Sequence, residues 1–298
     1  MKVSKKFFTI GILTILFSSF CFAQGPLSPY YKVAEVKGSV AAVMDQVKNL
    51  LTENGFEVIG SYNPGNKNSL GVVAFTRKDL KDAVLKHKHR GGLAAGMRVG
   101  LVNKGGTTTV SIVNPMYIFY AYLKEHTDKM PVAKRFTDDV KSTFSKMGGT
   151  LTGFGGELES KKLIKYRYMV GMQGYGNPAD LATFSSFSEG LSKIDANLKK
   201  KVGNTVEVYR IVDPSNQVAI FGVGLLDPDE GESHFLPIIG EDHVAAMPYE
   251  IILQGKEATM LHGRFRIALH WPELTMGTFT KIMSTPGNIE DFMKALCK

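Results

Sequence analysis

The sequence predicts an α+β fold made of two tandem β-α-β-β-α-β-β units with antiparallel hairpins, joined by a helix and a Gly-rich linker. The main observation is a hairpin pattern that occurs twice, at 91–115 and 244–272. In each copy an apolar arm leads into a glycine-containing turn, and a second apolar arm ends at a proline. Glycine supplies the positive φ of a tight turn, and proline lacks the N–H that a sheet needs.

The elements before the first hairpin are the clearest in the chain. Ser39 is placed to cap a helix whose apolar residues recur at helical spacing from Val40 to Leu51, and Gly55 follows as a terminating glycine. The spacing predicts strands at 30–36, 56–62 and 70–76, a second helix at 78–89, and hairpin arms at 97–103 and 107–113 around Lys104-Gly105-Gly106.

The second half is expected to repeat this order. The patterns predict a strand at 166–172, a helix from a cap at Asp180 to Leu198, strands at 205–212 and 217–225, an irregular helix at 233–243 and a hairpin at 247–269. A short element at 276–283 and a last helix capped by Asn288 complete the chain.

The segment between the two halves has its own signature. Pro131 begins an amphipathic helix, and residues 148–156 then hold five glycines. These glycines match neither GxxxxGK[ST] nor GxGxxG, so they indicate a linker or flexible lid. The expected organisation is a first unit at 24–125, a connecting segment at 126–160 and a second unit at 161–298.

Residues 1–23 have the pattern of a secretory signal peptide. Basic residues precede an apolar stretch at 7–20, and Ala23 supplies a small residue before the expected cleavage point. A lipoprotein signal with lipidated Cys21 is the alternative, although Phe20 is bulky for that position, and an uncleaved anchor also remains open. We expect a periplasmic or extracellular protein. Its remaining cysteine, Cys297, is expected to be a passive residue of a terminal helix, with pairing between chains as the alternative.

Composition limits the classes of partner. The chain is 44% apolar and 21% charged, as in globular proteins, and its net charge of +8 falls to +5 without the three lysines of the first segment. Basic and aromatic residues do not interleave as they do on nucleic-acid surfaces, so no nucleic-acid partner is expected. After the N-terminus, no stretch of 18 apolar residues predicts a membrane span.

Part of the chain resembles a known family. The helix GSVAAVMDQVKNLLTENGFEVI and the hairpin ending VSIVNP resemble the domain of unknown function 302, over about residues 31–123. The resemblance implies a small α+β fold, whose isolated domains pair as dimers, and no established activity or catalytic residue. The second half is similar to the tail of exported two-unit proteins in MPYEIIL, HGRFRIALHWPEL and MGTFTKIMSTPG. Its Trp271-Pro272 departs from the family's Asn/Asp-Pro, and it lacks the Gly-Phe helix end.

Candidate ligand-binding residues lie in the second hairpin. If 262–270 is a strand, its even-numbered side chains share one face, which could bind a carboxylate or phosphate, or could simply be solvated. The polar members of this face are His262, Arg264, Arg266 and His270. Tyr117 and Tyr120, in an aromatic run expected to form a short helix, could line a cleft between the units or be ordinary packing.

Metal ligands are a second possibility. His234, Glu241 and His243 lie close in sequence, and Met169 with Met172 could add soft ligands for copper(I). No HExxH motif or cysteine pair supports zinc, and His87 and His89 diverge on a helix. No cofactor is identified by a motif.

The sequence therefore predicts an exported, monomeric protein that binds a small molecule or protein partner. The alternative is a periplasmic metal-handling accessory protein, or an enzyme with a His-based site. No GxSxG motif or internal cysteine nucleophile favours the enzyme.

Overall fold

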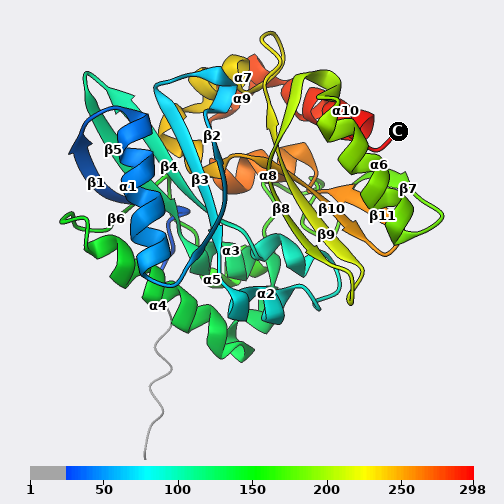
Figure 1. Ribbon diagram of the computed structural model, residues 1–298, viewed down its shortest axis with the longest axis horizontal. Coiled ribbons are helices and arrows are strands. Elements are labelled where there is room, and N and C mark those ends of the chain that lie inside the picture. The colour runs from blue at the N-terminus through cyan, green and yellow to red at the C-terminus, as the bar shows by residue number, and fades with distance from the viewer. Residues whose placement is uncertain (1–24) are drawn as a thin grey trace, which may run out of the picture.

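Residues 25–298 are described by the computed structural model, in which the strands form two antiparallel sheets placed side by side (Figure 1). The six-stranded sheet has the order β2-β3-β4-β5-β1-β6, and the five-stranded sheet has the order β7-β11-β10-β9-β8. Helices pack around both, so the predicted α+β class is confirmed. Within residues 25–298, no helix has the length and apolar character needed to cross a membrane. The predicted signal peptide lies outside these residues.

The first unit follows its local signals closely. Its elements are β1 (Tyr30–Lys37), α1 (Val40–Glu53), β2 (Glu57–Tyr62), η1 (Pro64–Asn66), β3 (Leu70–Thr76), α2 (Lys78–Val84), η2 (Gly91–Ala94), β4 (Met97–Lys104), β5 (Thr107–Val113) and α3 (Pro115–Tyr122). The Ser39 hydroxyl accepts a hydrogen bond from the Ala42 N–H, and Gly55 adopts φ +78° after the helix. The predicted cap, terminator and hairpin are thus confirmed, while α2 ends five residues before the predicted His89.

The connecting segment contributes a strand to the first sheet. After η3 (Lys124–Lys129) and α4 (Pro131–Ser145), β6 (Thr152–Phe154) pairs with β1, and α5 (Ser160–Ile164) follows. The segment at 148–156, predicted to be a linker or flexible lid, thus connects the units and also adds a short strand to the first sheet. Glycine allows this close packing: a Cβ on Gly149 would lie 1.8 Å from the Val33 carbonyl oxygen.

The second unit and the C-terminal segment complete the chain. Their elements are β7 (Ala179–Thr183), α6 (Phe187–Lys199), η4 (Val202–Asn204), β8 (Thr205–Asp213), β9 (Val218–Leu225), α7 (Glu232–Ile239), η5 (Glu241–Ala246), β10 (Tyr249–Gln254), β11 (Glu257–Met260), α8 (Gly263–His270), α9 (Met276–Phe279), η6 (Thr280–Ile282) and α10 (Thr285–Leu296).

Four predictions for this half were wrong. No strand forms at 166–172, and Asp180 belongs to β7 instead of capping a helix, since Ser186 caps α6. The second hairpin ends at Met260, and α8 replaces the rest of its expected arm. The last helix begins at Thr285, three residues before the predicted cap.

The two sheets share one strand order and the same irregularities. Read from β2, the first runs β2-β3-β4-β5-β1; read from β8, the second runs β8-β9-β10-β11-β7. Bulges interrupt pairing at Ile59 of β2 and Val208 of β8, and at Val33 of β1 and Leu181 of β7. Because bulges fix register locally, their matched positions confirm the predicted repeat of one unit.

Each unit also covers the sheet of the other. Helix α1 packs on one face of the first sheet, where Val40 lies against Gly71. The opposite face receives η5 of the second unit, since a Cβ on Gly100 would lie 2.6 Å from the Ala245 nitrogen. In return, η2 of the first unit packs on β9 and β10, where Gly92 approaches Ile220. This exchange joins the units through one continuous core.

Candidate functional site

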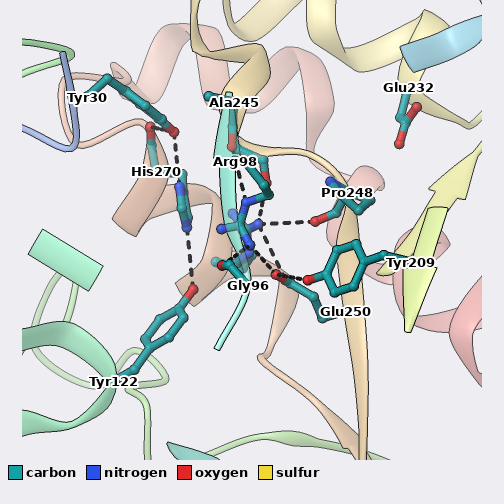
Figure 2. Close-up of polar contacts among 12 residues, drawn as sticks. Tyr30, Gly96, Arg98, Tyr122, Tyr209, Glu232, Ala245, Pro248, Glu250 and His270 are labelled. Carbon is teal, nitrogen blue, oxygen red and sulfur yellow. Dashed lines mark hydrogen bonds and ion pairs between the residues drawn. The ribbon is translucent and has the colours of Figure 1, made fainter. Parts of the chain in front are cut away.

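The repeat assigns each residue of one unit a counterpart in the other. In the first sheet, Arg98 of β4 pairs with Ala74 of β3. Ala74 in turn pairs with the residue of β2 that directly follows the bulge. Glu250 of β10 pairs with Gly222, which lies opposite the residue that follows the β8 bulge. Arg98 and Glu250 therefore occupy the same position in the two units. They also contact one another, as an ion pair buried between the sheets (Figure 2).

The buried centre around this ion pair holds two positive charges and one negative charge. The Arg98 Nη1 lies 2.5 Å from the Glu250 Oε1, and the Arg266 Nη2 lies 3.5 Å from the Glu250 Oε2. Tyr209 donates a further hydrogen bond to the Glu250 Oε1 over 3.2 Å. Both arginines also donate to backbone carbonyls, among them Ala245 for Arg98. Two guanidinium groups thus face one carboxylate, and all three side chains are at most 3% exposed.

A chain of aromatic hydroxyls lies beside the ion pair. The Tyr30 hydroxyl donates to the His270 carbonyl over 3.0 Å and lies 3.0 Å from the His270 Nδ1. On the other side of the ring, the Tyr122 hydroxyl is 3.4 Å from the Nε2 (Figure 2). Tyr122 and His270 are the last residues of the equivalent helices α3 and α8, so here too counterparts meet.

The buried centre stabilises the joint between the units instead of presenting chemistry to solvent. Burial lowers the pKa of His270 well below its usual range, with Arg266 and Arg98 adding to the effect, and burial lowers the pKa of His243 to about 4. A shifted histidine pKa can mark a catalytic group. Here His270 is fully buried, so it has no direct access to a substrate.

A second buried carboxylate ties the two units together a short distance away. The Glu232 side chain accepts hydrogen bonds from the Tyr62 hydroxyl (2.8 Å) and the Gly65 N–H (3.0 Å) of the first unit. It also accepts one from the Leu225 N–H of its own unit, over 3.2 Å. Despite these donors, burial raises the pKa of Glu232 to about 7, because no cation lies within ion-pair distance among residues 25–298.

The raised pKa of Glu232 predicts a pH-dependent stability. The folded pKa of about 7 exceeds the unfolded value of 4.5, so this group favours folding most below pH 4.5. That contribution is lost as pH rises through 7. The measured quantity is the difference in free energy of unfolding between the wild type and Glu232→Gln. We expect this difference to fall by about 3 kcal/mol between pH 4.5 and pH 8, because only the wild type carries the titrating carboxyl group. Urea denaturation at both pH values measures it, and a pH-independent difference would contradict the raised pKa.

The structure separates the four polar residues predicted to share a strand face. They belong to α8 and its cap, so they follow a helical period. The His262 Nδ1 accepts a hydrogen bond from the Arg264 N–H at the start of the helix. Arg266 and His270, four residues apart, both point into the buried centre, while Arg264 is exposed elsewhere. The prediction of a strand at 262–270 was wrong. Helix α8 is buried on nearly every side, so its sequence lacks the polar face that would indicate a helical period.

The other predicted site residues also lie apart from one another. Tyr117 is buried and donates to the Leu269 carbonyl, and Tyr120 donates to Asp128. Among the predicted metal ligands, Glu241 pairs with Lys67, and His243 stacks on Tyr30. His234 is exposed on α7. Residues 25–298 contain no group of three or more His, Cys, Asp or Glu side chains placed to hold a metal ion.

A polar pocket of 730 Å³ lies at the junction of the units. The loop between α2 and η2 forms one wall, the end of α3 with η3 forms another, and the segment before β7 closes the third. We call it the junction pocket. Its lining residues are Lys86, His87, Lys88, His89, Arg90, Gly91, Tyr122, Leu123, Lys124, Glu125, His126, Tyr175 and Gly176.

The junction pocket is strongly cationic. Four of its side chains carry fixed positive charge (Lys86, Lys88, Arg90 and Lys124), and one is a carboxylate. Within the described part of the chain, none of the four cations forms an ion pair, although most arginines and several lysines elsewhere do. Unpaired cations around one concave site attract anions. Burial, the neighbouring His126 and Lys86 all lower the pKa of His87, as expected beside positive charge.

Aromatic rings form the floor of the junction pocket. Tyr175 stacks on Tyr122, with ring centroids 5.4 Å apart. The Arg90 guanidinium and the Lys124 ammonium both lie over the Tyr175 ring, at 5.3 and 5.4 Å from its centroid. The same Tyr122 reaches His270 below, so the floor rests on the buried centre.

The walls are held across the two units and are strained. The Arg90 N–H donates to Gln254 of β10, and its Nη2 donates to the Tyr175 carbonyl over 2.7 Å. His89, Arg90 and Lys124 all adopt positive φ, between 54° and 67°. Non-glycine residues rarely adopt this conformation, and it concentrates at functional sites. The Arg90 Nε is buried and has no hydrogen-bond partner in the described chain.

Sequence reasoning missed this pocket. It noted His87 and His89 only as a weak metal pair. It considered the aromatic run from Tyr117 to Tyr122 as the lining of a cleft, but it did not connect this run with the basic residues. A usable signal was present in the basic run KHKHR directly before Gly91. Its partners, at 122–126 and 175–176, could not be identified without the fold.

Comparison with known proteins gives a limited result. No family model and no curated protein matches the chain. Among solved structures, the chain is similar to the crystal structure of the uncharacterized conserved protein DUF302 from Bacillus stearothermophilus, with 12% sequence identity and a TM-score of 0.31. The match covers 40% of this chain and 94% of that chain. The name of this structural neighbour is that of the family which the sequence resembles, the domain of unknown function 302.

Proposed function

We propose that the protein binds a small polyanion, with two or more phosphate or carboxylate groups, in the junction pocket. The observation that carries the proposal is the set of four unpaired cations around one concave site. Fixed positive charge in a pocket lowers the cost of gathering anionic groups, and charge-assisted hydrogen bonds then orient them. The Arg90 guanidinium, which lies over the Tyr175 ring at the pocket, supplies one such charged group.

The role of the fold in this proposal is to hold the cations together. Left alone, the four positive charges repel one another, so a rigid frame is needed to keep the pocket assembled. Gln254 and Tyr175 fix Arg90, and the tyrosine floor stabilises the cations above it by cation–π contact. The ligand then supplies the missing negative charge.

The cellular setting belongs to the same proposal. Residues 1–23 have the pattern of a secretory signal peptide, and we propose that cleavage near Ala23 releases a monomer outside the cytoplasm. The buried Cys297 supports the monomer, because a 3% exposed thiol is badly placed to pair with another chain. A dimer seen by light scattering would refute this part.

Calorimetric titration with tripolyphosphate, and separately with citrate, tests the function. We expect binding that weakens as salt is added, because exposed charges are screened. The variant Lys88→Gln/Lys124→Gln should weaken binding about tenfold, since two cations leave the pocket. The control Lys161→Gln/Lys200→Gln removes the same charge from exposed sites outside the pocket and should change affinity less than twofold. No binding of either probe at low salt, or equal losses in both variants, would refute the proposal.

A further inference from the structure

A second pocket, of 240 Å³, is mainly apolar, in contrast to the cationic junction pocket. It is formed by the loop at 168–172, by α8, and by α9 with the residues around it. Apart from Tyr168 and Arg264, its lining is apolar: Met169, Met172, Ile267, Ala268, Leu274, Met276, Phe279 and Met283. We call it the methionine pocket.

Exposed apolar side chains gather at this pocket. Within the described chain, five large hydrophobic residues are exposed, and three of them line it: Met169 (51%), Met276 (49%) and Met283 (58%). A fourth, Val170, is the neighbour of Met169. Single exposed hydrophobic residues need no explanation, but a cluster around a concavity indicates a binding site. Methionine suits such a site because its unbranched thioether adapts to ligands of different shape.

One charged group lies among these apolar side chains. Arg264 is exposed, and its guanidinium makes no hydrogen bond or ion pair with any residue in 25–298. The neighbouring arginine of α8, Arg266, is by contrast buried against Glu250. A free guanidinium beside an apolar pocket is complementary to a molecule with an apolar body and an anionic end.

We propose that the methionine pocket binds a single-chain amphiphile with an anionic head, such as a fatty acid carboxylate. The apolar chain lies against the methionines and Phe279, and the head forms a charge-assisted pair with Arg264. This site is separate from the junction pocket, with which it shares no lining residue.

A copper(I) ion held by thioethers is the main competing occupant, because soft metals bind methionine sulfur. The lining also contains Ile267, Ala268, Leu274 and Phe279, which offer no metal ligand but do offer apolar contact. Arg264 would repel a cation. The composition of the pocket therefore favours the amphiphile.

The first test measures affinity against chain length and head group. Hexanoate, octanoate and decanoate are titrated below their micelle concentrations, together with decanol. We expect affinity to rise about fourfold for each added methylene until the pocket is full. Arg264→Gln should weaken decanoate about tenfold and leave decanol within twofold, since only the carboxylate contacts the guanidinium. It should leave tripolyphosphate binding unchanged, which separates this proposal from that of the junction pocket.

The second test uses exposed residues whose replacement leaves the core intact. Met169→Ser/Met276→Ser should weaken decanoate and decanol alike, by about fivefold or more. The control Val212→Ser changes the exposed hydrophobic residue that lies away from the pocket and should have no effect. The proposal would be overturned if affinity did not depend on chain length, or if Arg264→Gln bound decanoate as tightly as the wild type. It would also be overturned if the protein bound copper(I) but none of the amphiphiles.

Discussion

Replacing Glu250 by glutamine is expected to lower the free energy of unfolding by about 3–5 kcal/mol. The substitution keeps the shape of the side chain and removes only its charge. Arg98 and Arg266 would then remain buried with no anion, and arginine cannot escape by losing its proton. Urea denaturation at pH 7, followed by circular dichroism, measures the loss.

Two comparisons test the cause of this loss. Arg98→Met should cost less than Glu250→Gln, because Glu250 would still have Arg266 as its partner and the centre would be neutral. Asp82→Asn removes one partner of the exposed Lys78–Asp82 pair and should leave the free energy of unfolding nearly unchanged. A larger loss for Arg98→Met than for Glu250→Gln would show that the excess positive charge is not what matters.

Adding a single methyl group at Gly60 should destabilise the chain by about 3 kcal/mol. Gly60 lies in β2 where that strand meets β8 of the second unit, and its new Cβ would lie 1.8 Å from the Val208 carbonyl oxygen. Backbone atoms on both sides must move apart, because no flexible side chain can yield. Thermal and urea unfolding of Gly60→Ala measure the effect.

The matched control for this substitution is Gly287→Ala in α10. Nothing lies within 4 Å of its added Cβ, and alanine favours helix, so we expect no loss and a gain of up to about 1 kcal/mol. If Gly60→Ala costs less than 1 kcal/mol, the close approach of β2 to β8 is not required for stability.

The two halves of the chain differed in how well the sequence predicted them, for a physical reason. In the first half, elements end at residues with strong local preferences: Ser39 at a helix cap, Gly55 and Gly105 at positive φ, and Pro115 after a strand. Such preferences act within a few residues, so the sequence shows them directly. Element types and most boundaries were therefore correct there.

The second half depends more on tertiary contacts. Helix α8 has buried residues from Phe265 to His270 on every side, so it carries no amphipathic period. Strand β7 is short and pairs with β11 across about 75 residues of chain. The more strand-like segment at 166–172 forms only an isolated bridge, between Arg167 and Gly174. Both candidate pockets combine segments distant in sequence, and for that reason sequence patterns did not reveal them.

The meeting of Arg98 with Glu250 bears on how such a chain could arise. In a dimer of two identical chains, a residue on the two-fold axis faces its own copy, so a charged residue there meets a like charge. An arginine can face a glutamate at this position only if the two copies differ in sequence, which requires that they mutate independently. Joining two copies in one chain removes the identity constraint, and the centre of the molecule can then hold opposite charges, or tyrosine opposite histidine. Because the two units can change independently, one repeated fold can also carry two different pockets.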